Sequence, residues 1–155
     1  MLDRNLIGKK YNPVIFTVTD QRLRFFAKAT GQTDPIYFDH DVALNEGYNG
    51  IVCPPTFLYV VSMEQKNPFE FLNDLKIKIE NILHAEQEFF YEKIICSGDT
   101  LTMITEIVDM YDKKGGLLQF FILESTFINQ NNLHTAIMKN TIAVSYTHLT
   151  LPTKA

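Results

Sequence analysis

The fold is decided by the stretch Pro54-Pro55-Thr56-Phe57-Leu58-Tyr59-Val60-Val61-Ser62-Met63. Pro55 suits the first position of a helix, because the N–H that proline lacks would have no partner there. The helix predicted from Thr56 to about Met63 is apolar nearly all round, through Phe57, Leu58, Val60 and Val61. A helix with this pattern is expected to be buried on every side. The rest of the chain must therefore supply the elements that surround it.

The residues after this helix predict an antiparallel sheet. Four long stretches are rich in β-branched and aromatic residues: His84–Ile95, Leu101–Tyr111, Leu117–Ile128 and Thr135–Val144. Short turn sequences separate them at 97–99, 113–116 and 130–132. Connections this short allow hairpins but no crossover helices, so neighbouring strands are expected to run antiparallel.

The third of these strands is apolar on both faces. One face carries Leu118, Phe120 and Ile122, and the other carries Leu117, Phe121 and Leu123. A strand with this pattern is expected to be covered on both faces, because neither face is suited to water.

The residues before the helix predict one strand and two more helices. Val14–Val18 has the β-branched composition of a strand. Thr19 or Asp20 can cap a helix that ends at Gly31, and Asp39–Glu46 predicts a second, short helix ended by Gly47.

Together these elements predict an α+β fold in which a long curved antiparallel sheet wraps around a central helix. Another subunit would cover the remaining face or edge of the sheet. The alternative is a single-layer α+β domain with its helices packed on one face. One domain is expected over residues 1–144, because domains usually comprise ~100–150 residues. Residues 145–155 do not continue the pattern of the last strand, and we interpret them as a non-native read-through or cloning tail.

The composition argues against several functions. The 14 basic and 18 acidic residues give a net charge of −4, so neither nucleic acid nor an anionic membrane is an expected partner. No apolar run approaches the roughly 20 residues that span a bilayer, and the first residues lack the apolar core of a signal peptide. We therefore expect a cytoplasmic protein. The histidines and the two cysteines lack the spacing of metal ligands, so no metal site is expected.

Four segments together resemble one known family. Gly31-Gln32-Thr33-Asp34-Pro35-Ile36-Tyr37-Phe38-Asp39 places polar side chains after a helix, and Gly50-Ile51-Val52-Cys53-Pro54-Pro55-Thr56-Phe57 leads into the apolar helix. His84-Ala85-Glu86-Gln87-Glu88-Phe89 and the following Ser97-Gly98-Asp99-Thr100-Leu101 complete the pattern. In these residues the chain resembles the MaoC-like dehydratase family, most closely its N-terminal-type, fatty-acid-synthase-type dehydratase domain, over about residues 8–144. The resemblance implies a hot-dog fold, subunits that pair, an acyl-CoA or acyl-carrier-protein thioester as substrate, and no cofactor.

The same resemblance implies that the catalytic groups have been replaced. Catalytic members carry approximately G-D-x-N-P-x-H-x-D, and the Asp and His move the protons that interconvert (3R)-3-hydroxyacyl and 2-enoyl thioesters. Here the Asp becomes Gln32, the His becomes Tyr37 and the Asn becomes Asp34. Glutamine has no proton to exchange, and tyrosine, with a reference pKa of ~10, is a poor base at neutral pH. Pro54-Pro55 replaces a His-Gly pair, and proline has no N–H to offer an enolate oxygen.

From this pattern we expect a substrate-binding subunit of a (3R)-3-hydroxyacyl-thioester dehydratase or 2-enoyl-thioester hydratase, paired with a separate catalytic MaoC-like subunit. The expected substrate-binding residues are Gly31, Gln32, Asp34, Pro35, Tyr37, Pro55 and Thr56. One alternative is a self-sufficient homodimeric enoyl-CoA hydratase that uses Asp34 or His40. The other is a non-enzymatic module that binds acyl thioesters.

Overall fold

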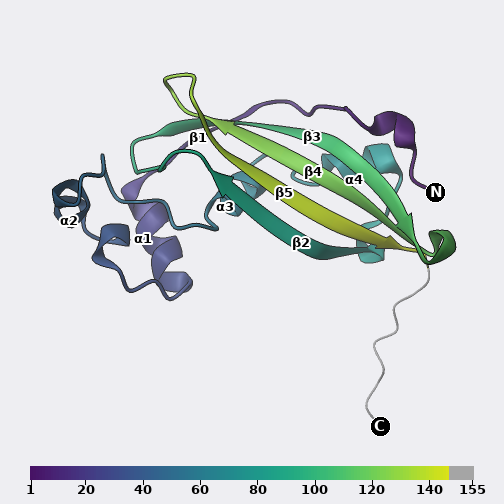
Figure 1. The fold of residues 1–155 in the computed structure, drawn as a ribbon, viewed down its shortest axis with the longest axis horizontal. Coiled ribbons are helices and arrows are strands. Elements are labelled where there is room, and N and C mark those ends of the chain that lie inside the picture. The colour runs from purple at the N-terminus through teal and green to yellow at the C-terminus, as the bar shows by residue number, and fades with distance from the viewer. Residues whose placement is uncertain (147–155) are drawn as a thin grey trace, which may run out of the picture.

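The computed structural model describes residues 1–146, in which a single five-stranded antiparallel sheet carries helices on one face (Figure 1). The strands are β1 (Val14–Thr17), β2 (Ile82–Tyr91), β3 (Thr100–Lys113), β4 (Leu118–Ile128) and β5 (His134–Ser145), in the sheet order β1-β3-β4-β5-β2. The α-helices are α1 (Asp20–Ala29), α2 (His40–Asn45), α3 (Leu58–Met63) and α4 (Glu70–Leu75). Short 3₁₀ turns are η1 (Arg4–Leu6), η2 (Pro35–Tyr37), η3 (Ile79–Asn81) and η4 (Lys114–Gly116). The predicted α+β architecture is confirmed.

The first residues of α1 and α2 are fixed by side chains that cap these two helices. The Thr19 hydroxyl accepts a hydrogen bond from the Arg22 amide and caps α1. The chain leaves α1 through Gly31, whose positive φ of 74° suits a residue without Cβ. The Asp39 carboxylate accepts bonds from the first amides of α2. Of the two predicted candidates, Thr19 and not Asp20 is therefore the cap of α1, and the predicted glycine after this helix is confirmed.

The start of the central helix differs from the prediction. Pro55 and Thr56 lie in a turn, closed by a hydrogen bond from the Phe57 amide to the Pro54 carbonyl at 3.0 Å, and α3 begins only at Leu58. Pro55 is therefore not the first helical residue, because the 3₁₀-type bond forms before the α-helical pattern begins. Helix α4 has no counterpart in the predicted set.

Helix α3 is buried deeply on one side only. Phe57, just before it, is 1% exposed and packs edge-on against Phe26 and obliquely against Phe16, with ring centroids 5.4 and 6.0 Å apart. Leu58 and Val61 are fully buried, whereas Met63 is exposed. The expectation of burial on every side is therefore wrong for the last turn of the helix.

Strand β2 ends four residues before its predicted end. It stops at Tyr91, and the following chain instead pairs with the segment that leads to α3. The Cys53 amide donates to the Ile95 carbonyl and the Ser97 amide to the Ile51 carbonyl, both at 2.8 Å. A bridge between Val52 and Cys96 lies between these bonds. The Glu92 and Lys93 amides both still donate to the Thr135 carbonyl of β5. From Ile95 onward the chain pairs instead with the entry to α3 and anchors it.

One face of β4 differs from its predicted set, whereas Leu118, Phe120 and Ile122 share the other face as predicted. Gln119, not Leu117, lies in the row of buried inward residues with Phe121 and Leu123, and Leu117 precedes the strand and is exposed. The outward Phe120 is half-buried because Tyr111 stacks on it at 4.9 Å. The chain thus covers part of its own outer face.

The inner face of the sheet carries two apolar clusters. The first includes Met103, Phe127 and Met138 together with Phe57 and α3. The second is formed by residues of α4 and of the other half of the sheet, including Ile107, Leu123 and Ile142. Between them the inward residues are polar: Thr105 on β3, Ser125 on β4 and Asn140 on β5. We call these three residues the polar belt.

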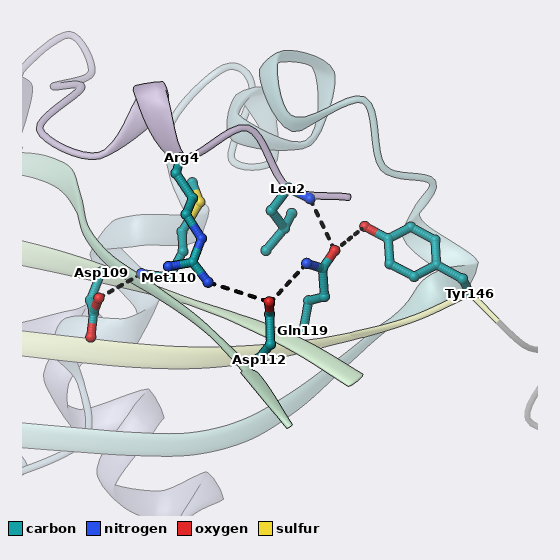
Figure 2. Close-up of polar contacts among 7 residues, drawn as sticks. All are labelled: Leu2, Arg4, Asp109, Met110, Asp112, Gln119 and Tyr146. Carbon is teal, nitrogen blue, oxygen red and sulfur yellow. Dashed lines mark hydrogen bonds and ion pairs between the residues drawn. The ribbon is translucent and has the colours of Figure 1, made fainter. Parts of the chain in front are cut away.

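The N-terminal segment is tied to the far end of the sheet through Gln119 (Figure 2). This buried side chain accepts hydrogen bonds from the Leu2 amide at 2.9 Å and the Tyr146 hydroxyl at 2.8 Å, and it donates to Asp112 at 2.8 Å. Arg4 pairs with the other oxygen of Asp112 at 3.3 Å. Each polar atom of Gln119 thus has a partner, which is what burial requires.

The predicted tail, residues 145–155, begins within the described part of the chain. Ser145 is the last residue of β5 and pairs with Leu118, and Tyr146 bonds to Gln119. Residues 147–155 lie outside the described residues. The proposed boundary after residue 144 thus falls one residue before the end of a strand.

We expect Phe57→Ala to lower the free energy of unfolding by about 3–5 kcal/mol, because it empties the space between α3 and two other aromatic rings. Urea unfolding followed by circular dichroism measures the change. Phe25→Ala is the matched control: Phe25 is 77% exposed, and its loss is expected to cost no more than about 0.5 kcal/mol. Equal losses for the two variants would contradict the central position of Phe57.

Candidate functional site

The motif segment after α1 is shaped by local hydrogen bonds. The Gln32 amide donates to the Ala27 carbonyl at 2.9 Å, which closes the end of α1 around Gly31. The Asp34 carboxylate accepts a bond from the Ile36 amide at 3.1 Å and caps η2, where Pro35 occupies the first turn. Asp34 therefore acts as an exposed turn cap in this structure.

One backbone contact joins this segment to the entry of α3. The Val52 amide donates to the Ile36 carbonyl at 3.0 Å. Since the neighbouring Cys53 is held by Ile95, the turn η2 is fixed beside the residues that precede Pro54-Pro55. The structure thus brings Tyr37, the last residue of η2, to the beginning of the central helix.

The Tyr37 phenol is partly buried and lies near the negative charge of Asp34. Burial, reinforced by the Asp34 carboxylate and then by Tyr48 and Cys53, raises the pKa of the Tyr37 phenol above its usual value. A phenol with a raised pKa stays protonated at neutral pH and acts as a hydrogen-bond donor, not as a base. Within residues 1–146, no hydrogen bond engages the Tyr37 hydroxyl, so this donor is free for a ligand.

Tyr91 is a further residue of this site. It lies at the end of β2, and its hydroxyl donates a hydrogen bond to the Pro55 carbonyl. Burial, followed by the influence of Cys53 and Tyr37, raises the pKa of Tyr91. The two phenols therefore approach the Pro54–Thr56 turn from different elements, η2 and β2. No specific signal in the sequence marks Tyr91, which lies inside the predicted strand His84–Ile95.

Cys53 has no nucleophilic character here. Its side chain is buried, and burial raises the pKa of its thiol. The thiolate, which is the reactive form, is therefore disfavoured. The sulfur instead lies 3.6 Å from the Pro54 carbonyl and packs in the first apolar cluster.

The other candidate residues do not form a proton-transfer pair. His40 is exposed at the first position of α2, and in the described part of the chain no hydrogen bond or ion pair joins it to Gln32, Asp34 or Tyr37. Pro55 and Thr56 are exposed at the turn before α3, and the Thr56 amide is the first backbone N–H after the two prolines. The site can therefore donate hydrogen bonds and position a ligand, but it holds no imidazole beside a carboxylate.

A cavity of about 130 Å³ lies at the other end of α3. It is partly open to solvent and is lined by α3, by the segment from α3 into α4, by the inner face of β2 to β5 and by Tyr11. Leu58 and Ser62 are four residues apart, so the site and the cavity are separated by roughly 6 Å along the helix axis. Sequence analysis missed this cavity because its walls come from elements that are distant in the chain.

The sequence predicts neither a metal site nor a membrane-spanning helix, and the structure bears on both over the described residues alone. Over residues 1–146, no three His, Cys, Asp or Glu side chains are grouped so that they could hold a metal ion. In the same range no helix has both the length and the apolar composition to cross a membrane. The cytoplasmic location stays a prediction.

The comparisons with known proteins agree on one family. The model of the FAS1-like dehydratase domain region matches residues 5–138. A UPF0336 protein of Tropheryma whipplei (strain Twist) is 33% identical over 128 residues, which cover 82% of this chain and 89% of that protein.

Solved structures share the fold at low identity. A chain of the C-terminally truncated HadBC (3R-hydroxyacyl-ACP dehydratase) complex from Mycobacterium tuberculosis superposes with a TM-score of 0.78 at 21% identity, covering 89% of this chain and 96% of that one. A chain of the ChsH1-ChsH2 complex from the same organism gives a TM-score of 0.66 at 21% identity, covering 88% and 84%. These likenesses confirm the predicted hot-dog fold. Because the family model matches most of its length, the chain belongs to the FAS1-like dehydratase domain family of MaoC-like hot-dog proteins.

Proposed function

We propose that this chain is the substrate-binding subunit of a (3R)-3-hydroxyacyl-thioester dehydratase or 2-enoyl-thioester hydratase, and that a separate MaoC-like chain supplies catalysis. The observation that supports this most directly is the state of Tyr37. A free phenol with a raised pKa stands at the position where catalytic relatives carry their histidine. Such a group binds an oxygen atom but does not remove a proton from carbon.

The reaction needs groups that this site does not offer. Moving a proton at C2 and another at the hydroxyl oxygen requires a positioned acid and base, each worth roughly 10²–10⁴ in rate. Gln32 does not titrate, Asp34 caps a turn, and His40 lies apart on α2. A second chain with an intact acid and base would supply what is missing.

The role left to this chain is to hold the thioester. The free Tyr37 hydroxyl can donate to a carbonyl or hydroxyl oxygen, and the Thr56 amide lies on the same turn that Tyr91 fixes through Pro55. Donors held in place before the ligand arrives bind it without reorganisation. We therefore assign the polar end of the substrate to this turn and its acyl tail to the cavity beyond α3.

The sheet edge supports pairing with a second hot-dog subunit. Strand β2 lies at the edge of the sheet and presents Leu83 and Phe90, which are 54% and 48% exposed. A long edge strand with exposed apolar side chains is a site for pairing with another chain. The complexes that resemble this chain are named for two components, HadBC and ChsH1-ChsH2, which fits such a pairing.

We expect this chain and a catalytic MaoC-like protein of the same genome to form a heterodimer. Analytical ultracentrifugation detects the complex, and the loss of enoyl absorbance measures hydration of crotonyl-CoA. The complex is expected to hydrate at least about tenfold faster than the partner alone, because the acyl group is then positioned. This chain alone should be inactive.

Two results would replace the proposal. Hydration by this chain alone that is abolished by His40→Ala or Asp34→Ala would establish the self-sufficient homodimer. Binding of acyl-CoA without turnover beside the catalytic partner would establish a binding module instead.

Tyr37→Phe is expected to raise the KM of the complex for crotonyl-CoA about five- to tenfold, because one hydrogen bond to the substrate is lost, with little change in kcat. Tyr111→Phe is the matched control: it removes the same hydroxyl from a ring that stacks on Phe120 on the outer face. The raised pKa of Tyr37 keeps the phenol protonated, so its contribution to KM should be constant from about pH 6 to about pH 9. A contribution that disappears within this range would show that the group titrates and would contradict its role as a donor.

A further inference from the structure

The polar belt meets the cavity at the middle of the sheet. Thr105, Ser125 and Asn140 all line the cavity from the inner face. Polar side chains at the centre of a hot-dog sheet occupy the place where a continuous apolar core would otherwise form. The first question is therefore which of them already have partners.

Asn140 is the member of the belt without a partner. Thr105 and Ser125 satisfy each other through a hydroxyl–hydroxyl bond of 2.7 Å. The Asn140 Oδ1 atom is buried and has no hydrogen-bond partner within the described residues. The Oε1 atom of Gln87, the cross-strand neighbour of Asn140 on β2, is likewise buried and unpaired, although its amide nitrogen donates to the Lys139 carbonyl at 3.1 Å. Two neighbouring acceptors thus lack a donor, and one of them belongs to Asn140, which lines the cavity.

The opposite wall of the cavity is apolar. Phe71 of α4 lines it across from the sheet, and Leu123 and Ile142 continue the apolar lining beside the polar belt on the sheet itself. Ligand sites in proteins combine mainly apolar walls with a few placed polar groups that orient the ligand. This cavity has that composition.

Size limits what the cavity can hold. At about 130 Å³ it is slightly smaller than an apolar cavity of about 150 Å³ that holds benzene, which corresponds to about six carbon atoms. The space suits the end of a short chain.

We propose that this cavity binds the far end of the acyl group and selects a tail that carries a hydroxyl. This inference rests on the proposed substrate-binding function. A hydroxyl both donates and accepts, so it satisfies the Asn140 amide whichever way that amide is oriented. A plain alkyl tail offers the Asn140 amide no hydrogen-bond partner.

A carboxylate at the end of the tail does not fit. Glu70 lines the cavity, and within residues 1–146 no lysine or arginine does. The Tyr11 hydroxyl, also in the lining, is already engaged with Asp74 at 3.1 Å. The histidine of the lining, His84, has its Nε2 atom 3.2 Å from the Glu86 carbonyl. A negative tail would therefore meet the Glu70 carboxylate and, within the described residues, no lysine or arginine, whereas an uncharged hydroxyl meets the Asn140 amide.

The test compares matched thioesters. Titration calorimetry measures binding of straight-chain acyl-CoAs from butanoyl to decanoyl, and of the same chains with a terminal hydroxyl, to the full chain and to its complex with the catalytic partner. At the length that reaches the cavity, the hydroxylated thioester is expected to bind about tenfold more tightly. Asn140→Leu, which keeps the volume and removes the amide, should abolish this preference and leave the plain thioester bound at least as well.

The control is Asn131→Leu, the same exchange in the exposed turn between β4 and β5. Equal binding of plain and hydroxylated thioesters at every length, or a preference that survives in Asn140→Leu, would overturn the inference and leave the proposed function standing. Absence of binding by every thioester, with and without the partner, would overturn both. If Asn140→Leu does not fold, the comparison of matched thioesters on the unaltered chain decides alone.

Discussion

Burial of Phe57 and α3 beneath the sheet is the contact on which the rest of the structure depends. A helix of six residues without a side-chain cap is not stable by itself in water, because helices shorter than ~12–15 residues are marginal even in favourable sequences. Its order comes from packing, with Phe57 held between Phe16 and Phe26 and with Leu58 and Val61 fully buried. Because α3 is fixed in this way, the turn before it and the cavity beyond it are also fixed.

Much of the fold could be predicted because the signals are local. Thr19 and Asp39 cap helices by bonds to amides two or three residues away, and the strands follow from β-branched runs between turns. The exact start of α3 could not be predicted from the sequence, because Pro55 is compatible both with the first position of a helix and with the turn that forms here. The prediction also placed Leu117 on the inner face of β4, because it extended the alternation of side chains back to this residue. The strand begins only at Leu118, so the alternation does not apply to Leu117.

In the candidate site, too, some features could be predicted from local sequence and others could not. The motif located Tyr37 and the turn at Pro54-Pro55, but Tyr91 and the cavity depend on strand register. A bulge between His84 and Glu86 shifts the alternation of β2, so that Gln87, not Glu86 or Glu88, faces the helix opposite Asn140. A bulge adds one residue and moves every later side chain to the other face. No pattern in the sequence indicates where this extra residue lies, so the acceptors beside the cavity could not be placed beforehand.

The polar belt is costly for stability and therefore informative about function. A buried polar group without a partner costs about 1–3 kcal/mol, and an apolar residue of similar size at Asn140 would remove this cost. Natural sequences depart from the most stable packing chiefly where a site needs it. The candidate site holds Gln32 and Tyr37 and, within the described residues, no imidazole beside a carboxylate, while the interior keeps an amide oxygen without a partner in a residue that lines a cavity. Both features are consistent with a subunit that recognises the substrate and leaves the reaction to its partner.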